Sequence, residues 1–314
     1  MNSVVDITLP VFGIALLGYF ATRLKFFSAE AGTGLARFVF DFAIPALLVR
    51  TFANADLPSA LPINYLLSYY IPVALFYVLG MLLAAKVYGR PLAGQAITGF
   101  SCCYGNGILL GLPLVLLTFG DEASIPYFIL LSMHALTLFT TVTVLLEVSR
   151  NRDANILRKV GNVLLGLLKN PILIGIVCGI ALNRLHIEIP TSIDTALRYF
   201  QNAVAACSLF ALGVSMTRYR IAGQLTQSIV VTITKNLGLP LIVYLSCSMV
   251  FGMSAHWTFV AVLLAAQPTG VNAYIFAERY NTAQALTTTT VFISTALSLI
   301  TLPTLLYLRE SGVL

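Results

Sequence analysis

Charged side chains are scarce in this sequence. Only 10% of its 314 residues are Asp, Glu, Lys or Arg, against about 25% in an ordinary soluble domain. Hydrophobic residues make up 58% of the chain, and its mean hydropathy is +0.90. A water-soluble protein needs far more polar side chains to cover its surface. The composition therefore excludes a soluble globule, a disordered chain and a disulfide scaffold, and it predicts an all-α polytopic membrane protein.

Motifs for catalysis and metal binding are also missing. The five cysteines lie inside apolar stretches without the spacing of metal ligands, and the three histidines fall in different segments. The hydrolase motifs H-E-x-x-H and G-x-S-x-G do not occur. We therefore expect no metal and no cofactor. A membrane-embedded enzyme and a receptor without transport activity are the alternatives to a carrier.

Ten segments are long and apolar enough to cross a bilayer, which takes about 20 residues of helix. They span residues 4–22, 31–52, 64–87, 93–118, 125–148, 169–184, 195–216, 226–250, 256–277 and 284–308, and are numbered here as segments 1 to 10. The first apolar run is not preceded by positive charge and carries Asp6. A retained first helix is expected rather than a cleaved signal peptide.

The basic residues between the segments predict the orientation. Inner loops of membrane proteins are enriched in Lys and Arg, and an outside N-terminus places most of these residues inside. The inner residues would be Arg23, Lys25, Lys86, Arg90, Arg150, Arg152, Arg158, Lys159, Lys169, Arg218, Arg220 and Arg279, and the outer ones Arg50, Arg184 and Arg309. The protein is predicted to lie in the cell (inner) membrane, with both termini on the outer side. Because these charges form no single patch, we expect a lipid bilayer as partner and no nucleic acid.

The two halves of the chain resemble each other. A shift of 161 residues superposes parts of segments 1 and 2 on segments 6 and 7 without a gap. The matched pairs include Pro10 with Pro171, Gly18 with Gly179, Arg37 with Arg198, Asp41 with Asn202 and Leu48 with Leu209. The predicted repeats are residues 1–150 and 169–314, joined by a cytoplasmic linker at 151–168. Since each holds five segments, the second must be inverted, and inverted repeats are typical of secondary transporters.

Segments 4 and 9 each contain proline, glycine and side-chain amides in the middle of an apolar span. Segment 4 carries Gly105, Asn106, Gly107, Gly111 and Pro113, and segment 9 carries Gln267, Pro268, Gly270 and Asn272. Proline removes a backbone donor and glycine favours unwinding. Matched interruptions in two repeats are a strong sequence signal for a transport site. The exposed half-helix N-termini would suit an anion, and the three amides would add hydrogen bonds. The alternative is a proline kink with close helix packing.

Ionisable residues inside predicted spans are functional candidates, and among them are Asp41, Lys235 and His134. Asp41 is near the middle of segment 2 and is either a coupling-ion or proton site or the partner of Arg37 in a structural ion pair. Lys235 in segment 8 could attract the anion, pair with a carboxylate or brace the crossover. His134 is expected to be core rather than a proton relay.

Five short motifs occur in order along nearly the whole chain. They are Phe42-Ala43-Ile44-Pro45, Asn106-x4-Gly111-x-Pro113 ending at Phe119-Gly120, Asn170-Pro171, Leu209-Phe210-Ala211-Leu212-Gly213, and Pro268-x-Gly270 followed by Phe276-Ala277 and Tyr280. In these motifs the chain resembles the auxin efflux carrier family, which includes the plant PIN carriers. The absence of a long central loop resembles a prokaryotic member.

The resemblance implies a transporter of small organic anions that works by an elevator-type alternating access. Segments 1, 2, 6 and 7 would form a scaffold that makes a homodimer, and segments 3–5 and 8–10 a mobile unit in which segments 4 and 9 cross. Asn106 and Ile44 would line the site, and Gly111 and Pro113 would shape the crossover. Ile172 and Ala273 replace an asparagine and a proline of the plant carriers, which weakens the case for auxin itself. The likeness to a prokaryotic member implies dicarboxylates such as malonate or malate, with an auxin-like carboxylate as the alternative.

Overall fold

Helices make up almost all of the part of the chain that the structure describes. The structure, a computed structural model, describes residues 2–55, 62–120, 124–150 and 169–312, together with Gly161 and Leu165. No strand longer than an isolated bridge occurs in these ranges. Seven helical stretches are long and apolar enough to cross a membrane, namely Val4–Arg23, Ala29–Ala53, Ile63–Lys86, Ile125–Arg150, Thr191–Met216, Leu225–Val250 and Gln284–Glu310. The all-α membrane prediction is confirmed.

Three of the ten predicted segments are helical but are not long continuous spans. Segment 4 is divided into α5 (Leu92–Cys103) and a second half at Gly107–Phe119, and segment 9 into α13 (Ala255–Ala265) and α14 (Asn272–Arg279). Segment 6 is the 14-residue helix α9 (Pro171–Arg184). It begins two residues later than predicted, because the Asn170 side chain accepts a hydrogen bond from the Ile172 amide and caps the helix.

The other segments are helical over most of their predicted length, several with a wider turn inside. The elements are α1 (Asn2–Arg23), α2 (Ala29–Phe38), η1 (Val39–Ala43), α3 (Ile44–Ala53), α4 (Ile63–Lys86), η2 (Gly107–Gly111), α6 (Leu112–Phe119), α7 (Ser124–Arg150), α10 (Thr191–Met216), α11 (Leu225–Ile233), η4 (Thr234–Gly238), α12 (Leu239–Leu245), η5 (Ser246–Val250) and α15 (Gln284–Glu310). The π-helical turns η1, η2 and η4 each end two residues before a proline. Because proline cannot donate to the preceding turn, the helix widens there.

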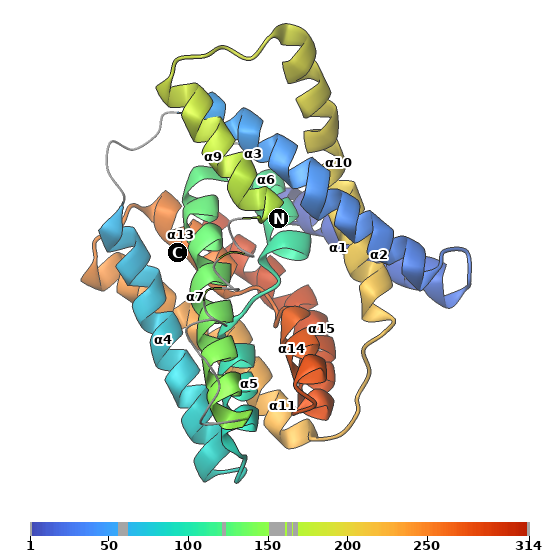
Figure 1. The fold of residues 1–314 in the computed structure, drawn as a ribbon, viewed down its shortest axis with the longest axis vertical. Coiled ribbons are helices and arrows are strands. Elements are labelled where there is room, and N and C mark those ends of the chain that lie inside the picture. Colours follow the sequence, from blue (N-terminus) through green and yellow to red (C-terminus); the bar gives the residue numbers. More distant parts are fainter. Residues whose placement is uncertain are drawn as a thin grey trace.

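Two helix pairs pack so closely that only glycine fits between them. Helix α1 lies against α10, and α3 lies against α9 (Figure 1). A Cβ at Gly18 would lie 2.3 Å from the Phe210 carbonyl oxygen, and one at Gly179 would lie 2.9 Å from that of Val49. The 161-residue shift maps Gly18 onto Gly179 and Val49 onto Phe210. The two contacts are therefore equivalent: in each, the matched glycine of one half meets the matched carbonyl of the other half.

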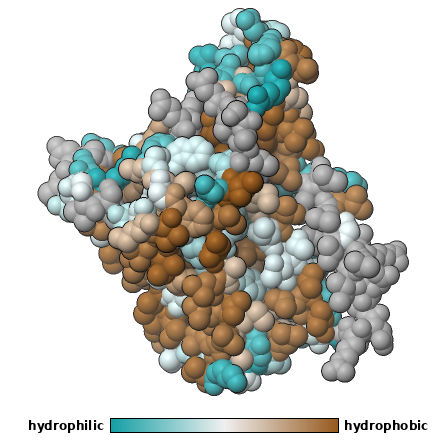
Figure 2. Space-filling view, turned by 90° about the vertical axis from the view of Figure 1, so that its left-hand side faces the viewer, coloured by the Kyte–Doolittle hydropathy of each residue, from teal (hydrophilic) through white to brown (hydrophobic). Residues whose placement is uncertain are grey.

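A second group of helices presents an apolar surface. Helix α4 packs on α5, with α7, α12 and α13 nearby. The outer side of α4 exposes apolar residues at helical spacing, namely Leu67, Ile71, Leu75, Val78 and Leu82. A broad apolar band covers this face of the molecule, with hydrophilic residues toward its ends (Figure 2). Such a band is what contact with lipid requires.

The glycine contact of α1 predicts a position-specific loss of stability. We expect Gly18→Ala to lower the free energy of unfolding by about 1–3 kcal/mol, because the new methyl group overlaps the Phe210 carbonyl. Gly13→Ala, on the same helix with no atom within 4 Å of its Cβ, should instead stabilise by about 0.5–1 kcal/mol through helix propensity. Thermal unfolding of the detergent-purified variants measures both. Equal melting temperatures for the two would contradict the close packing.

Candidate functional site

Segment 4 unwinds in the middle of the protein. Helix α5 ends at Cys103, residues 104–106 are not helical, and the chain resumes helical turns at Gly107. Tyr104 is extended, with ψ 113°. Glycines on both sides of Asn106 reduce the cost of leaving the helical conformation. The break therefore lies where the sequence analysis expected it.

Segment 9 unwinds at the corresponding place of the second half. Helix α13 ends at Ala265, and α14 begins at Asn272. Pro268 lies between them and has no amide hydrogen to continue the α13 ladder. The N-terminal end of α14 has no side-chain cap. The Ala273 and Tyr274 amides donate to the Gly270 and Val271 carbonyls at 3.0 and 3.1 Å. This end of α14 therefore contributes the positive end of its helix dipole more than free amides.

The two unwound stretches pair with each other as short antiparallel strands. Gly105 and Thr269 form an isolated bridge. The Asn106 amide donates to the Pro268 carbonyl at 2.8 Å, and the Gly270 amide donates to the Tyr104 carbonyl at 2.9 Å. A backbone group without a partner at this depth would cost several kcal/mol. Each break thus satisfies backbone groups that the other leaves open.

Side chains hold this crossover from both sides. The Thr269 hydroxyl donates to the Ser101 carbonyl at 3.0 Å, and its amide donates to the Ser294 hydroxyl at 3.1 Å. The Tyr127 hydroxyl donates to the Gly107 carbonyl at 2.6 Å. A Cβ at Gly111 would lie 2.2 Å from that hydroxyl, so glycine leaves room for it. Contacts from α5, α7 and α15 therefore fix the breaks in place.

Lys235 lies directly behind the crossover. Its side chain is fully buried, and its ammonium donates to the carbonyl of Ala265, the last residue of α13. A cation is favourable at a helix C-terminus, where the helix dipole is negative. A Cβ at Gly105 would lie 3.3 Å from the ammonium nitrogen. Since the described residues offer Lys235 no carboxylate partner, the bracing role fits this contact better than a salt bridge.

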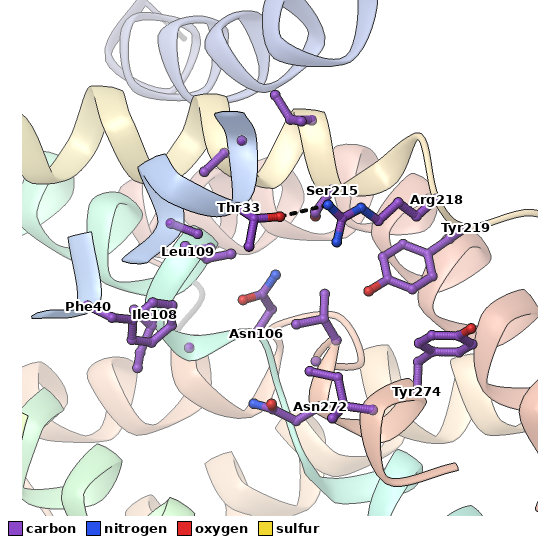
Figure 3. Close-up of a pocket in the computed structure, with 18 of the residues that line it drawn as sticks. Thr33, Phe40, Asn106, Ile108, Leu109, Ser215, Arg218, Tyr219, Asn272 and Tyr274 are labelled. Carbon is purple, nitrogen blue, oxygen red and sulfur yellow. Dashed lines mark hydrogen bonds between the residues drawn. The ribbon is translucent and has the colours of Figure 1, made fainter. Parts of the chain in front are cut away.

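A cavity of about 430 Å³ lies on the other side of the crossover. One wall is formed by α2, η1 and the end of α10, and the other by both unwound stretches and α14. Figure 3 labels several of its polar side chains, namely Thr33, Asn106, Ser215, Arg218, Tyr219, Asn272 and Tyr274. Tyr104 and Glu278 also line it. The cavity therefore joins the two predicted structural units at the point where both helices are broken.

The electrostatics of the cavity favour an anion. The N-terminal ends of the helical stretch Gly107–Phe119 and of α14 both line it, and helix N-termini carry partial positive charge. Among the described residues that line the cavity, Arg218 is the only basic one and Glu278 the only acidic one. The Glu278 carboxylate accepts a hydrogen bond from Tyr274 at 3.1 Å. Burial raises the pKa of Tyr219 to about 12, so that its hydroxyl remains a neutral donor.

The predicted binding residues fall into two groups. Asn106, Asn272 and Gly270 line the cavity, and the Asn272 amide also donates to the Tyr104 hydroxyl at 2.9 Å. Gln267 is buried beneath the crossover and donates to the Leu263 carbonyl. Ile44 is fully buried at the start of α3. Neither Gln267 nor Ile44 lines the cavity. Of the four residues predicted to bind substrate, only Asn106 and Asn272 therefore line it.

Asp41 does not line the cavity, although the preceding residue Phe40 does. Asp41 lies in η1 and is exposed, and Arg37, near the end of α2, is exposed as well. No ion pair between them occurs in the structure, although both are described. The predicted structural ion pair is therefore not formed within one chain, and a coupling role for Asp41 stays a prediction.

Sequence reasoning missed one wall of the cavity. Thr33 and Ser215 are ordinary polar residues near the ends of segments 2 and 7, and Arg218 and Tyr219 belong to the following loop. In the sequence, Arg218 served only as one of the inner-side basic residues that predict the orientation. Their common signal is position, because all four lie near the same predicted membrane face, but sequence does not show which helix ends converge.

Comparisons with known proteins agree on one class. A family model described as "Membrane transport protein" matches residues 3–306. The chain is 28% identical over 323 residues to a "Putative malonate transporter" of Rhizobium meliloti (strain 1021), which covers 100% of this chain and 98% of that protein. It is 26% identical over 354 residues to auxin efflux carrier component 8 of Arabidopsis thaliana, with 96% and 95% covered.

A relative with a different description matches a smaller region. The lysosomal cholesterol signaling protein of Mus musculus is 28% identical over 222 residues, which cover 66% of this chain and 25% of that protein. The two full-length matches and the family model confirm the resemblance to auxin efflux carriers.

The sign of the charge that the cavity accepts can be tested at Asn272. With radiolabelled malonate as a probe anion, we expect Asn272→Asp to bind more than about tenfold more weakly than the wild type, because a carboxylate would face the anion. Asn272→Ala should cost only about 2–10-fold, the value of one hydrogen bond. An acidic residue in the first turn of α14 favours the helix, so folding should be retained. Equilibrium dialysis of purified protein measures both constants, and unchanged binding in Asn272→Asp would exclude an anion at this position.

Proposed function

Because the chain belongs to the family of membrane transport proteins, whose members are transporters and not enzymes, we propose that it is a secondary transporter of small organic anions. The observation that carries this proposal is the cavity at the crossover, where two half-helix N-termini and the amides of Asn106 and Asn272 line one space. An anion bound there would replace lost hydration with backbone and amide hydrogen bonds.

The proposed architecture is a ten-segment inverted repeat. It is supported by the paired breaks in segments 4 and 9 and by the exchanged contacts of Gly18 with Phe210 and of Gly179 with Val49. Segments 1, 2, 6 and 7, which pack on one another as α1 with α10 and α3 with α9, would form the scaffold. The remaining segments would form the unit that carries the crossover.

The proposed mechanism is elevator-type alternating access. The cavity has α2 and α10 of the scaffold on one side and the crossover on the other. A substrate held by the crossover could therefore move with it past the scaffold wall. The lining residues Arg218 and Glu278 are exposed and form the mouth of the cavity, next to loops predicted to lie inside. The structure would then be the inward-facing state, in an inner membrane with both termini outside.

Flux assays test the proposal. Proteoliposomes that contain the purified protein should take up radiolabelled malonate with saturation, and empty liposomes should not. Gly270→Val should abolish uptake, because even a Cβ there would lie 2.6 Å from the Tyr104 ring. Imposed pH, sodium or voltage gradients would identify the coupling ion. Saturable binding without uptake of any tested anion would favour the receptor alternative, and the absence of both would contradict the proposal.

A homodimer through the scaffold would cover an unusual exposed surface. Arg37 and Asp41 are exposed within the stretch Ala29–Ala53, which is long enough to span the membrane. On α10, Tyr199 is 73% exposed beside the exposed Arg198. Charged side chains are costly in lipid, and a second copy would offer them opposite charges and protein surface.

The dimer has a direct test. We expect Asp41→Arg to convert a dimer into a monomer, because it places like charges together in the proposed interface. Leu75→Gln, on the exposed side of α4, should leave the dimer intact. Light scattering of detergent-purified protein measures the mass. A monomeric wild type, or a dimer in both variants, would contradict this interface.

A further inference from the structure

We propose that Arg218 forms a second anion subsite of the cavity and selects dianions over monoanions. This inference rests on the proposed function and assigns a role to a residue on the opposite wall from the crossover. Arg218 follows the end of α10, lies exposed at the mouth of the cavity and is the one basic side chain among the lining residues that the structure describes.

The side chain of Arg218 is held in place by α2. Its Nη2 atom donates to the Ala29 carbonyl at 2.8 Å and to the Thr33 hydroxyl at 2.7 Å. Both acceptors belong to the first turns of α2, so the guanidinium is fixed before any ligand enters. Preorganised donors bind more tightly because less side-chain freedom is lost.

The same geometry leaves hydrogen-bond capacity unused. A guanidinium carries five N–H groups, and the bonds to Ala29 and Thr33 use only those of Nη2. The Nε and Nη1 groups have no partner among the described residues. In Figure 3 the Asn106 amide and the Tyr219 hydroxyl point into the space that this guanidinium borders. A carboxylate there would gain charge-assisted hydrogen bonds.

The two anion-binding features lie on different walls. The half-helix N-termini with Asn106 and Asn272 form the crossover wall, and Arg218 with Thr33 forms the α2–α10 wall. A monoanion can occupy only one of them, whereas a small dicarboxylate can place one carboxylate at each. The negative charge of Glu278 at the mouth repels both monoanions and dianions. The positive charge of Arg218 offsets this repulsion.

The test compares two probes of nearly equal size and different charge. Malonate carries two carboxylates at pH 7.5, and its monoamide carries one. For the wild type we expect a half-saturation concentration for uptake that is at least about tenfold lower for malonate. Arg218→Gln should remove this preference by raising the malonate value about tenfold and changing the monoamide value less than about twofold.

Two further variants separate recognition from folding. Arg218→Lys keeps the charge and should retain part of the preference. Glu278→Gln should lower the half-saturation concentration for malonate more than that for the monoamide. Equal loss of both probes in Arg218→Gln, or no preference in the wild type, would overturn the inference while leaving the anion transporter intact. No uptake of either probe by the wild type would contradict the proposed function itself.

Discussion

The rest of this structure depends on one constraint, which is that the unwound backbones of two broken helices hydrogen-bond to each other. Backbone groups at the middle of a membrane protein need partners, and here the stretch 104–106 supplies them to 266–271 and receives them in return. Each break therefore supplies hydrogen-bond partners that the other needs. The surrounding polar contacts follow from this pairing, including the hydroxyls of Thr269 and Tyr127 and the buried ammonium of Lys235.

The pairing also explains why a cavity forms on one side of the crossover. Antiparallel pairing fixes the two half-helices so that both N-terminal ends line the same space. Lys235 holds the C-terminal end of α13 from behind. Positive helix ends therefore face the cavity, and a negative helix end faces a buried cation. This distribution of partial charge suits an anion without placing a charged side chain in either unwound stretch.

The sequence predicted the features that have a strong local cause. Apolar length gave the helices, and Pro268 with its neighbouring glycines predicted the break in segment 9. The sequence did not predict which helix ends meet, because only the packing of α2 on α10 brings together Thr33, Ser215 and Arg218. Gln267 shows the converse limit. Its amide looked like a ligand group, but the turn at the end of α13 directs it to the Leu263 carbonyl. Asp41 shows a third limit, since segment periodicity does not reveal whether a polar residue faces the interior of the chain or its outside.

We expect the paired breaks to bind the transported anion. A crystal structure of the purified protein with malonate decides whether they do. It should show density for the ligand in the cavity, with a carboxylate within hydrogen-bond distance of the Asn106 side chain or of the first amides of the stretch Gly107–Phe119. Malonate bound elsewhere, with this cavity empty at saturating concentration, would contradict this expectation.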